Sequence, residues 1–427
     1  MILTKYKLGE ILDVTRGASL SGEYYATEGE YIRLTCGNFD YQNNCFKENK
    51  SKDNLYYVGD FKSEFLMEEG DIITPLTEQA IGLLGSTAII PESGKYIQSQ
   101  DVAKIICKED LLDKDFAFYL ISSALVKQQL SAAAQQTKIR HTSPDKIKDC
   151  TVWIPELSEQ KRIGKLLRSI DRKIELNRAI NQNLEAMAKQ LYDYCFVQFD
   201  FPNENGRPYK SFGGKMVWNE KQRKYIPEYW EVKSLSNWLE IKSGFPFKSE
   251  TYKPIGRYKI ITIKNVQDGE LVTSGCDYVN DIPSRAKDYI SLQIGDRLIS
   301  LTGNCGRLCV VCEENLLLNQ RVGLLCCDAI YLEYFYNFLN SGTMRTVIDN
   351  LANGAAQANL SPVELCKTDC FIPPIDILLS YNRKVNAIRK AIVQNNQEIS
   401  QLAKQRDELL PLLMNGQVSV NSDLSDG

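Results

Sequence analysis

Two long stretches of the chain carry apolar residues at alternating steps of three and four positions. The first runs from residue 157 to about residue 199 without a proline, and its apolar positions are Ile163, Leu167, Ile170, Ile174, Leu184, Met187, Leu191 and Tyr194. The second runs from residue 375 to about residue 414, with Val385, Ile388, Ile392, Ile399, Leu402 and Leu409. This spacing predicts two long helices, each with the seam of a coiled coil. Asn177 and Asn395 fall at equivalent seam positions, where a buried asparagine lowers stability but fixes the register.

The rest of the chain shows shorter periods that are typical of an α/β fold. Strands are predicted at residues 31–34, 70–73, 258–263 and 294–299, and the second and fourth have a Gly-Asp turn at or near their start. Short amphipathic helices are predicted around residues 116–130 and 331–351. We therefore expect two globular α/β domains and two long helices.

The second half of the chain repeats the first at an offset that drifts slowly. Leu8, Leu12 and Gly17 match Leu235, Leu239 and Gly244 at an offset of 227. Farther along, Ser143-Pro144 matches Ser361-Pro362, and Ile154-Pro155 matches Ile372-Pro373, both at an offset of 218. The drift corresponds to short loop deletions, and the residues between these anchors differ. The repeat therefore predicts two units that share a scaffold but not a surface.

The predicted helices are longer than a single small domain requires. About 40 residues at ~1.5 Å per residue span about 60 Å, whereas the globular parts have about 150 residues each. Two similar helices, each following its own globular unit, can pair antiparallel around a pseudo-twofold axis and separate the two units. The alternative, in which each helix is a core element of its own domain, remains open.

Several segments resemble the specificity subunits of Type I restriction–modification enzymes. They are Ile154-Pro155-Glu156-Leu157-Ser158-Glu159-Gln160-Lys161-Arg162-Ile163, residues 167–174, the linker at residues 201–210, and Pro227-Glu228-Tyr229-Trp230-Glu231-Val232. The first unit lacks the Pro-x-x-Trp entry of the second, and the second helix lacks the Ser-Glu-Gln-Lys-Arg run. The resemblance covers nearly the whole chain.

The resemblance implies two target-recognition domains, each of which reads one half of a split site in double-stranded DNA. The implied boundaries are 1–154 for the first domain, 155–199 for the first spacer helix, 200–371 for the linker and second domain, 372–418 for the second spacer helix, and 419–427 for a disordered tail. It also implies that two methyltransferase subunits dock on the helices and that restriction–translocase subunits join that core. Two non-identical readers imply an asymmetric target, whereas a symmetric dimer reads a palindrome.

The composition limits where and how such a chain could act. The formal net charge is −3, so DNA binding would need local basic surfaces or a partner that supplies positive charge. The 13 cysteines show no compact disulfide framework, and we find neither a signal peptide nor an apolar run of membrane-spanning length. A reduced, cytoplasmic location is therefore expected.

The sequence offers little for catalysis, and we expect neither an enzyme nor a cofactor. His141 is the single histidine, so no multi-histidine metal site can form, and we expect a structural or neutral role for it in a loop. Methyltransferase Asn-Pro-Pro-Tyr, Gly-x-Gly-x-x-Gly and P-loop motifs are missing from the sequence. Cys305, Cys309 and Cys312, with Cys326-Cys327, could suggest zinc, but two strands with buried thiols are expected there. Residues 145–148 are expected to form a solvated turn.

Base readout requires side chains with paired donors and acceptors on loops that can enter the major groove. Polar loops recur at matching places in the two units. Any one of these residues could equally be a solvated loop residue or a turn former. In the first unit the candidates are Arg16, Ser19, Tyr24, Asn38, Thr77, Gln79, Gln98, Gln100, Gln136, Lys138 and Arg140. In the second unit they are Lys242, Ser243, Lys248, Lys264, Asn265, Thr302, Asn304, Arg307, Gln320 and Gln357.

Two other functions remain open at this point. The chain could be a coiled-coil scaffold whose globular ends bind something other than DNA. It could also be the specificity subunit of a related Type IIB-like system with different partners.

Overall fold

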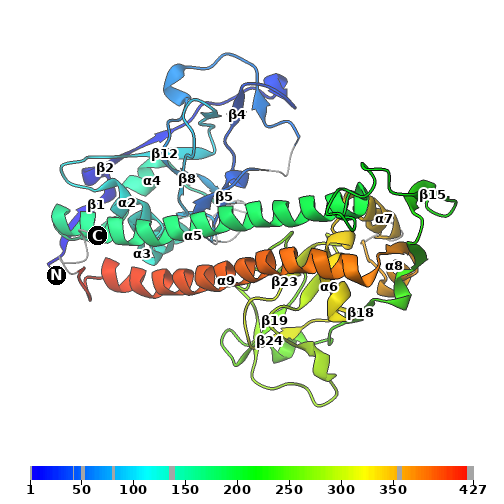
Figure 1. Ribbon diagram of the computed structural model, residues 1–427. Helices are drawn as coiled ribbons and strands as arrows, with labels where there is room; N and C mark the ends of the chain where they lie inside the picture. The colour runs from blue at the N-terminus through cyan, green and yellow to red at the C-terminus, as the bar shows by residue number, and fades with distance from the viewer. Residues whose placement is uncertain are drawn as a thin grey trace. The chain divides into compact units, whose positions relative to one another are not determined.

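The computed structural model describes residues 2–41, 43–49, 53–78, 82–133, 140–352 and 358–420. Contacts divide the chain into two compact units, Met1–Lys173 with Leu402–Gly427, and Ile174–Gln401. Each unit includes part of both long helices, α5 (Leu157–Tyr192) and α9 (Ile375–Met414), which Figure 1 shows in green and in orange to red.

The first unit contains two four-stranded sheets. One is antiparallel throughout and has the order β10-β8-β12-β2, with β2 (Leu12–Arg16), β8 (Ile72–Pro75), β10 (Ala88–Ile89) and β12 (Val102–Cys107). The other has the order β11-β4-β7-β3, with β3 (Tyr25–Ala26), β4 (Tyr31–Arg33), β7 (Tyr56–Tyr57) and β11 (Tyr96–Ile97). In this second sheet β11 runs parallel to β4.

Short helices and paired strands complete the first unit. The helices are α1 (Leu8–Ile11), α2 (Lys114–Ile121), α3 (Ala124–Ala133) and α4 (Pro144–Lys148). The additional strand pairs are β1 (Thr4–Lys7) with β14 (Thr151–Ile154), β9 (Thr77–Glu78) with β13 (Arg140–His141), and β5 (Phe39–Asp40) with β6 (Cys45–Phe46). Helix α2 and the antiparallel sheet share one apolar cluster with Ile163 and Leu167, so that they pack on the first part of α5.

The second unit repeats the antiparallel sheet of the first strand for strand, whereas its other sheet has its additional strand at a different edge. Its antiparallel sheet has the order β18-β25-β22-β23, with β18 (Glu240–Ser243), β22 (Arg297–Ser300), β23 (Leu308–Val310) and β25 (Val322–Cys326). Its other sheet has the order β20-β19-β24-β21, with β19 (Tyr258–Ile261), β20 (Tyr278–Val279), β21 (Ser291–Leu292) and β24 (Leu316–Leu318). As in the first unit, the strand equivalent to β4 runs parallel to its neighbour, because β19 pairs parallel with β24.

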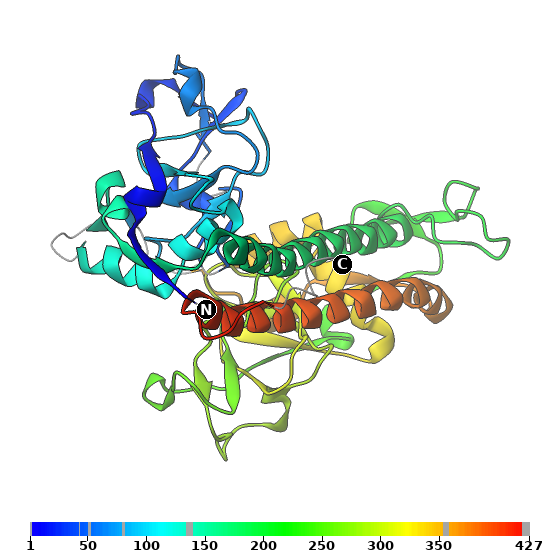
Figure 2. The ribbon, with the colours of Figure 1, turned by 90° about the vertical axis from the view of Figure 1, so that its left-hand side faces the viewer.

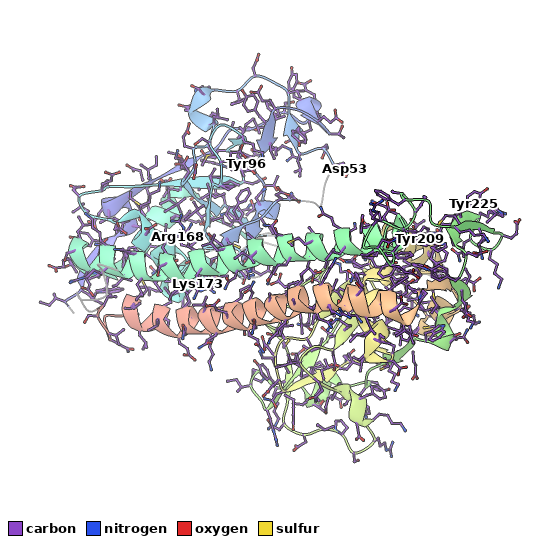
Figure 3. All side chains as sticks on the ribbon, in the orientation of Figure 1. Asp53, Tyr96, Arg168, Lys173, Tyr209 and Tyr225 are labelled. Carbon is purple, nitrogen blue, oxygen red and sulfur yellow. The ribbon has the colours of Figure 1, made fainter. Side chains whose placement is uncertain are left out.

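The remaining elements of the second unit follow the same scheme, with one addition. The strand β17 (Glu231–Ser234) pairs with β26 (Asp369–Ile372), and the helices are α6 (Ala329–Leu339), α7 (Gly342–Ala352) and α8 (Pro362–Cys366). The addition is a hairpin of β15 (Met216–Asn219) and β16 (Lys224–Pro227), which projects from the second unit in Figures 1 and 2. Figure 3 places Tyr225 on this hairpin and Tyr209 nearer to the helices. The sequence pattern did not predict this β15–β16 hairpin.

Local sequence explains why the two units keep equivalent helices. The Ser143 hydroxyl accepts from the backbone N–H of Lys146, and the Ser361 hydroxyl accepts from that of Glu364, both at 3.3 Å. In each case a proline occupies the first turn, where its missing N–H costs nothing. The repeated Ser-Pro pair is therefore the start of a helix, and residues 145–148 form α4 rather than the solvated turn that we expected.

The two long helices pair antiparallel within each unit. In the first unit, Arg406 donates to Asp171 at 2.8 Å. In the second unit, Asn177 donates to Glu398 at 2.8 Å, and Asn395 donates to Asn181 at 2.9 Å. Partner numbers on α9 fall as the numbers on α5 rise, which is the signature of antiparallel pairing. The two asparagines at equivalent positions, Asn177 and Asn395, thus both hydrogen bond across the helix pair.

The buried seam of α5 differs from the predicted one toward its C-terminal end. Ile163, Leu167 and Ile174 are buried, as are Val385, Ile392 and Ile399 on α9. Ile170, Leu184, Leu191, Ile388, Leu402 and Leu409 are half-buried. Met187 and Tyr194 are instead 50% and 36% exposed, and the buried positions are Ala188, Tyr192 and Cys195. An α-helix has 3.6 residues per turn, so a strict seven-residue count drifts around the helix, and the buried face moves one residue onward.

Helix α5 continues beyond Tyr192 as a single π-helical turn, Asp193–Val197, so the helical segment ends close to the predicted residue 199. One further expectation is corrected by the structure. His141 lies in β13 and not in a loop, since it pairs with Thr77 of β9.

Candidate nucleic-acid interface

In the first unit, five predicted or neighbouring polar residues meet where β2, β9, β12 and β13 come together. Arg16 at the end of β2 donates its Nε–H to the backbone carbonyl oxygen of Gln100 at 2.8 Å. The next residue, Asp101, accepts from the Thr77 hydroxyl at 3.3 Å. The same hydroxyl lies 3.2 Å from Nδ1 of His141. We call Arg16, Thr77, Gln100, Asp101 and His141 the first cluster.

The first cluster is accessible and carries both donors and acceptors. The side chains of Arg16, Gln100 and His141 are exposed, and those of Thr77 and Asp101 are half-buried. Among the described residues, the guanidinium group of Arg16 is anchored through its Nε–H alone, which leaves its two terminal nitrogens to bind another group. An anchored arginine beside a carboxylate and an amide is the kind of surface that can pair with base edges.

The second unit builds the same backbone, and three of the five equivalent side chains differ. The backbone N–H of Leu76 donates to the Asp101 carbonyl at 2.8 Å, and that of Leu301 donates to the Arg321 carbonyl at 3.0 Å. Likewise, the β9–β13 pairing at Thr77 and His141 is repeated as a bridge between Thr302 and Asn359. The equivalent residues, which we call the second cluster, are Ser243, Thr302, Gln320, Arg321 and Asn359.

The charges of the two clusters are arranged differently. Ser243 stands where the first cluster has Arg16, and Arg321 stands where it has Asp101. Asn359 replaces His141. Gln320, Arg321 and Asn359 are exposed. The cationic side chain therefore lies at the end of β2 in the first cluster but directly before β25 in the second, on an equivalent backbone.

A glycine at the same place in both units holds each cluster together. A Cβ on Gly17 would lie 2.2 Å from the Gln98 carbonyl oxygen, and one on Gly244 would lie 2.2 Å from the Leu318 carbonyl oxygen. Any side chain would push the two backbone segments apart, because real Cβ contacts of this kind are essentially never below 3.0 Å. The repeated glycine brings the end of β2 or β18 against the segment that carries Gln100 or Gln320.

Three predicted base readers have structural roles instead. Asn38 is 2% exposed, and its side-chain oxygen accepts from the backbone N–H of Thr35 at 2.9 Å. Asn265 does the same for Thr262 at 2.8 Å and is 6% exposed. Gln98 is 1% exposed and donates to the carbonyl oxygens of Thr15 and Val102. Side chains that are buried and hydrogen-bonded in this way cannot reach a base edge, so these three residues are not base readers.

The other predicted residues are either bonded to neighbouring side chains or exposed at the surface. The guanidinium group of Arg307 donates to the side-chain oxygen of Gln267 at 2.5 Å, and Nζ of Lys242 lies 3.4 Å from a carboxylate oxygen of Glu240. The Thr302 hydroxyl is buried without a hydrogen-bond partner among the described residues. The exposed candidates outside the clusters are Ser19, Tyr24, Lys248, Lys264 and Asn304. Gln79, Gln136, Lys138 and Gln357 lie outside the described residues, as does the side chain of Arg140.

Helix α5 presents a second feature, an apolar stripe that faces away from the buried seam. Leu176, Ile180 and Met187 are 56%, 47% and 50% exposed. Their spacing of four and seven places them on one face of the helix. Ile174 and Ala188, on the other face, are buried. We call Leu176, Ile180 and Met187 the α5 stripe. Exposed apolar stripes of this kind commonly mark a protein interface.

The described residues provide no constellation for metal or membrane chemistry. Across the described ranges, His, Cys, Asp and Glu side chains do not gather in threes that could hold a metal ion. Cys309 lies in β23, and burial raises the pKa of its thiol well above the ordinary value, which suits an inert core residue. In the same part of the chain, every helix is too short or too polar to cross a membrane.

Comparison with known proteins shows which proteins the chain is similar to. The profile of the Type I restriction modification DNA specificity domain matches residues 3–186. The specificity subunit of the Type I restriction enzyme MjaIX from Methanocaldococcus jannaschii is 24% identical over 332 residues, which cover 75% of this chain and 73% of the relative. The HindI specificity subunit from Haemophilus influenzae is 23% identical over 375 residues, covering 76% and 81%.

A solved structure shares the fold. The crystal structure of the Type I restriction–modification S subunit from M. genitalium matches with a TM-score of 0.56 and 16% identity, covering 97% of this chain and 96% of the other. Residues 3–186 thus match the Type I restriction modification DNA specificity domain, and the chain is similar to Type I restriction enzyme specificity subunits over 75% or more of its length.

Proposed function

We propose that the first and second clusters read the two halves of a bipartite, asymmetric DNA site. The observation that carries this proposal is the pairing of a repeated backbone with non-repeated side chains. Leu76 and Leu301 make the same backbone hydrogen bond in their units, yet the residues that they position are Asp101 and Arg321. A scaffold that is kept while its exposed polar residues change is what two different readers require.

The side chains suggest different base preferences for the two clusters. Arginine pairs bidentately with O6 and N7 of guanine, and a carboxylate accepts from N4 of cytosine. The first cluster offers these groups in Arg16 and Asp101. The second cluster offers Arg321 and Asn359, and asparagine pairs bidentately with adenine. Because the cation and its neighbours change place between the clusters, the same short sequence would not satisfy both, and the complete site would be asymmetric.

Mapping of adenine methylation tests this proposal. The chain is co-expressed with its methyltransferase subunit, and the modified positions on a plasmid are sequenced. Arg16→Ala should relax one position of one half-site by about 5- to 150-fold, the range that one bidentate contact supports, and Arg321→Ala should relax only the other half-site. Lys62→Ala, which removes an exposed cation that is not part of the first cluster, is the matched control. Equal loss at both half-sites would contradict the assignment.

We further propose that the α5 stripe is a docking face for a methyltransferase subunit, and that the restriction subunit joins through that core. Leu176, Ile180 and Met187 offer a partner helix a row of apolar contacts at helical spacing. Met187→Glu should reduce co-purification of the methyltransferase at least tenfold. Ala186→Glu adds the same charge at an exposed position outside the stripe and should leave co-purification unchanged. Equal effects of the two variants would argue against the stripe.

We infer that the chain contributes recognition and not catalysis, and that it acts on cytoplasmic DNA. The sequence supports this inference, since its single histidine and missing methyltransferase motif leave no familiar catalytic set. Two competing functions have distinct outcomes in the methylation assay. A scaffold with ends that do not bind DNA would give an unmodified plasmid, and a Type IIB-like system would cut on both sides of the site.

A further inference from the structure

A buried carboxylate lies between the helices of the first unit. Asp171 of α5 is 8% exposed. Its Oδ2 accepts from the Tyr119 hydroxyl of α2 at 2.5 Å, and its Oδ1 accepts from Arg406 of α9 at 2.8 Å. The side chain of Arg406 is itself only 11% exposed. The charge of Asp171 is thus compensated across the helix pair.

A buried guanidinium group lies between the helices of the second unit. Arg389 of α9 is 4% exposed and stacks 4.5 Å from the centre of the Tyr336 ring. It donates from Nε to Glu333 of α6 at 3.3 Å and from Nη1 to Glu185 of α5. Arg297 of β22 also pairs with Glu333. Here too, one charged partner comes from the opposite long helix.

The two buried charges occupy equivalent places in the repeat but have opposite signs. Asp171 and Arg389 are separated by the offset of 218 that relates the two helices. Their partners across the helix pair are replaced by alanine in the other copy. The equivalent of Arg406 is Ala188, and the equivalent of Glu185 is Ala403. The charges are therefore complementary only when α5 pairs with α9.

Pairing of like helices from two copies would remove the charged partner that each of these groups has on the opposite long helix, although Arg389 would keep Glu333. If α5 paired with α5, Asp171 would face Ala188 where it now meets Arg406. If α9 paired with α9, Arg389 would face Ala403 where it now meets Glu185. Removing one partner of a buried ion pair typically costs several kcal/mol because the other charge stays buried. Asn177 and Asn395 do not discriminate in this way, because the same residue stands at both places.

We propose that Asp171 and Arg389 select the partner of each long helix, so that α5 accepts α9 and rejects a second copy of α5. The interaction surface is the α5 seam around Asp171 and Ala188, and the partner that it fits is a helix with a cation opposite Asp171. This inference concerns assembly and does not depend on which bases the clusters read. The test identifies associated fragments by mass spectrometry and does not measure DNA methylation, so a negative result would leave the proposed function unaffected.

The test uses the full chain, cleaved after it has folded. A protease site is placed at Asn205 in an exposed turn, which yields fragments of about residues 1–205 and 206–427. A normal and an isotope-labelled preparation are cleaved and mixed. Urea is then raised until native mass spectrometry detects hybrids of one N-terminal and one C-terminal fragment, which shows that partners exchange. In the wild type, pairs of two N-terminal fragments should remain below about 1% of these hybrids, the ratio that a buried unpaired charge implies.

Two variants remove the selection in different ways. Ala188→Arg supplies a cation opposite Asp171 in an α5–α5 pair, and it places that cation beside Arg389 in the native pair. Asp171→Asn removes the buried charge with almost no change in shape, so it remains informative if the larger substitution prevents folding. Each should raise the fraction of N-terminal pairs at least tenfold. The proposal is overturned if wild-type N-terminal fragments pair as often as they form hybrids, or if both variants stay as exclusive as the wild type.

Discussion

Removal of a single hydroxyl group, in Tyr119→Phe, tests how strongly the recognition domain of the first unit is tied to α5. Tyr119 is 2% exposed, and its hydroxyl donates to the buried carboxylate of Asp171 at 2.5 Å. Burial and the adjacent carboxylate raise the pKa of Tyr119, so the hydroxyl remains a donor at neutral pH. A hydrogen bond to a charged group contributes about 1.5–3 kcal/mol. Since Arg406 still compensates Asp171, we expect a loss of about 2 kcal/mol in the free energy of unfolding.

Two other buried tyrosines provide matched comparisons. The Tyr334 hydroxyl donates to the uncharged carbonyl oxygen of Phe371 at 2.6 Å, so Tyr334→Phe should cost about 0.5–1.5 kcal/mol. The Tyr336 hydroxyl is buried with no hydrogen-bond partner among the described residues. Tyr336→Phe keeps the ring beside Arg389 and should be neutral or stabilising, because the phenylalanine has no hydroxyl to desolvate.

Hydrogen exchange in increasing urea measures each loss where it occurs. Exchange in α2 reports on the first unit, and exchange in α6 reports on the second, which avoids a two-state treatment of the whole chain. We expect the order Tyr119→Phe, then Tyr334→Phe, then Tyr336→Phe, from most to least destabilising. Equal losses would refute the reasoning, because they would show that the charge and presence of an acceptor do not set the cost.

Three further predictions concern backbone contact, a lysine and pH. Gly17→Ala would place its Cβ 2.2 Å from the carbonyl oxygen of Gln98, so methylation of one half-site should fall at least tenfold. Gly22→Ala is the control, because its Cβ would meet only a ring carbon of Tyr25 at 3.9 Å, and it should leave methylation unchanged. Burial lowers the pKa of Lys224 to about 8, so an acylating reagent at pH 8 should label Lys224 about tenfold faster than the exposed Lys221, as read by peptide mass spectrometry; equal labelling would contradict this. Burial raises the pKa of Glu313, but hydrogen bonds from Lys259, Thr273 and Ser400 lower it by a larger amount, so the net pKa lies below the ordinary value. The stabilising effect of Glu313 should therefore be present above about pH 4.5 and lost as the pH falls through the folded pKa. Glu313→Gln should therefore flatten the acid side of a stability–pH curve measured in urea, and an unchanged curve would exclude this role.

Periodicity predicted the long helices well but not the buried face along their whole length. The bounds of α9 match the predicted ones because its apolar spacing continues to Met414. On α5, two apolar faces run side by side toward the C-terminal end, one through Ile174 and Ala188 and one through Leu176 and Met187. Both faces satisfy helical spacing. Sequence spacing alone cannot show which of them the partner helix covers, because that depends on packing against residues distant in the chain.

The candidate readers show a different limit. Asn38 and Asn265 are polar residues in loops at matching places, which is also what a reader would show. A signal for their structural role was present, because each follows a threonine by three positions and hydrogen bonds back to it. Asp101, Arg321 and Asn359 were missed because nothing in a linear pattern places them beside Arg16 or Ser243. Their proximity arises from sheet pairing between segments far apart in the chain.

The two-stranded ribbons that close each unit have a consequence for how such chains diversify. In the first unit, Thr4 lies opposite Ile154, and in the second, Glu231 lies opposite Ile372. The first and last strands of each globular α/β part are therefore adjacent in a fixed register, and the last strand comes immediately before a long helix. Genetic recombination within these ribbons would exchange a whole domain through two neighbouring junctions and leave the helices untouched. A new DNA specificity could then arise in one event, without any new solution for assembly.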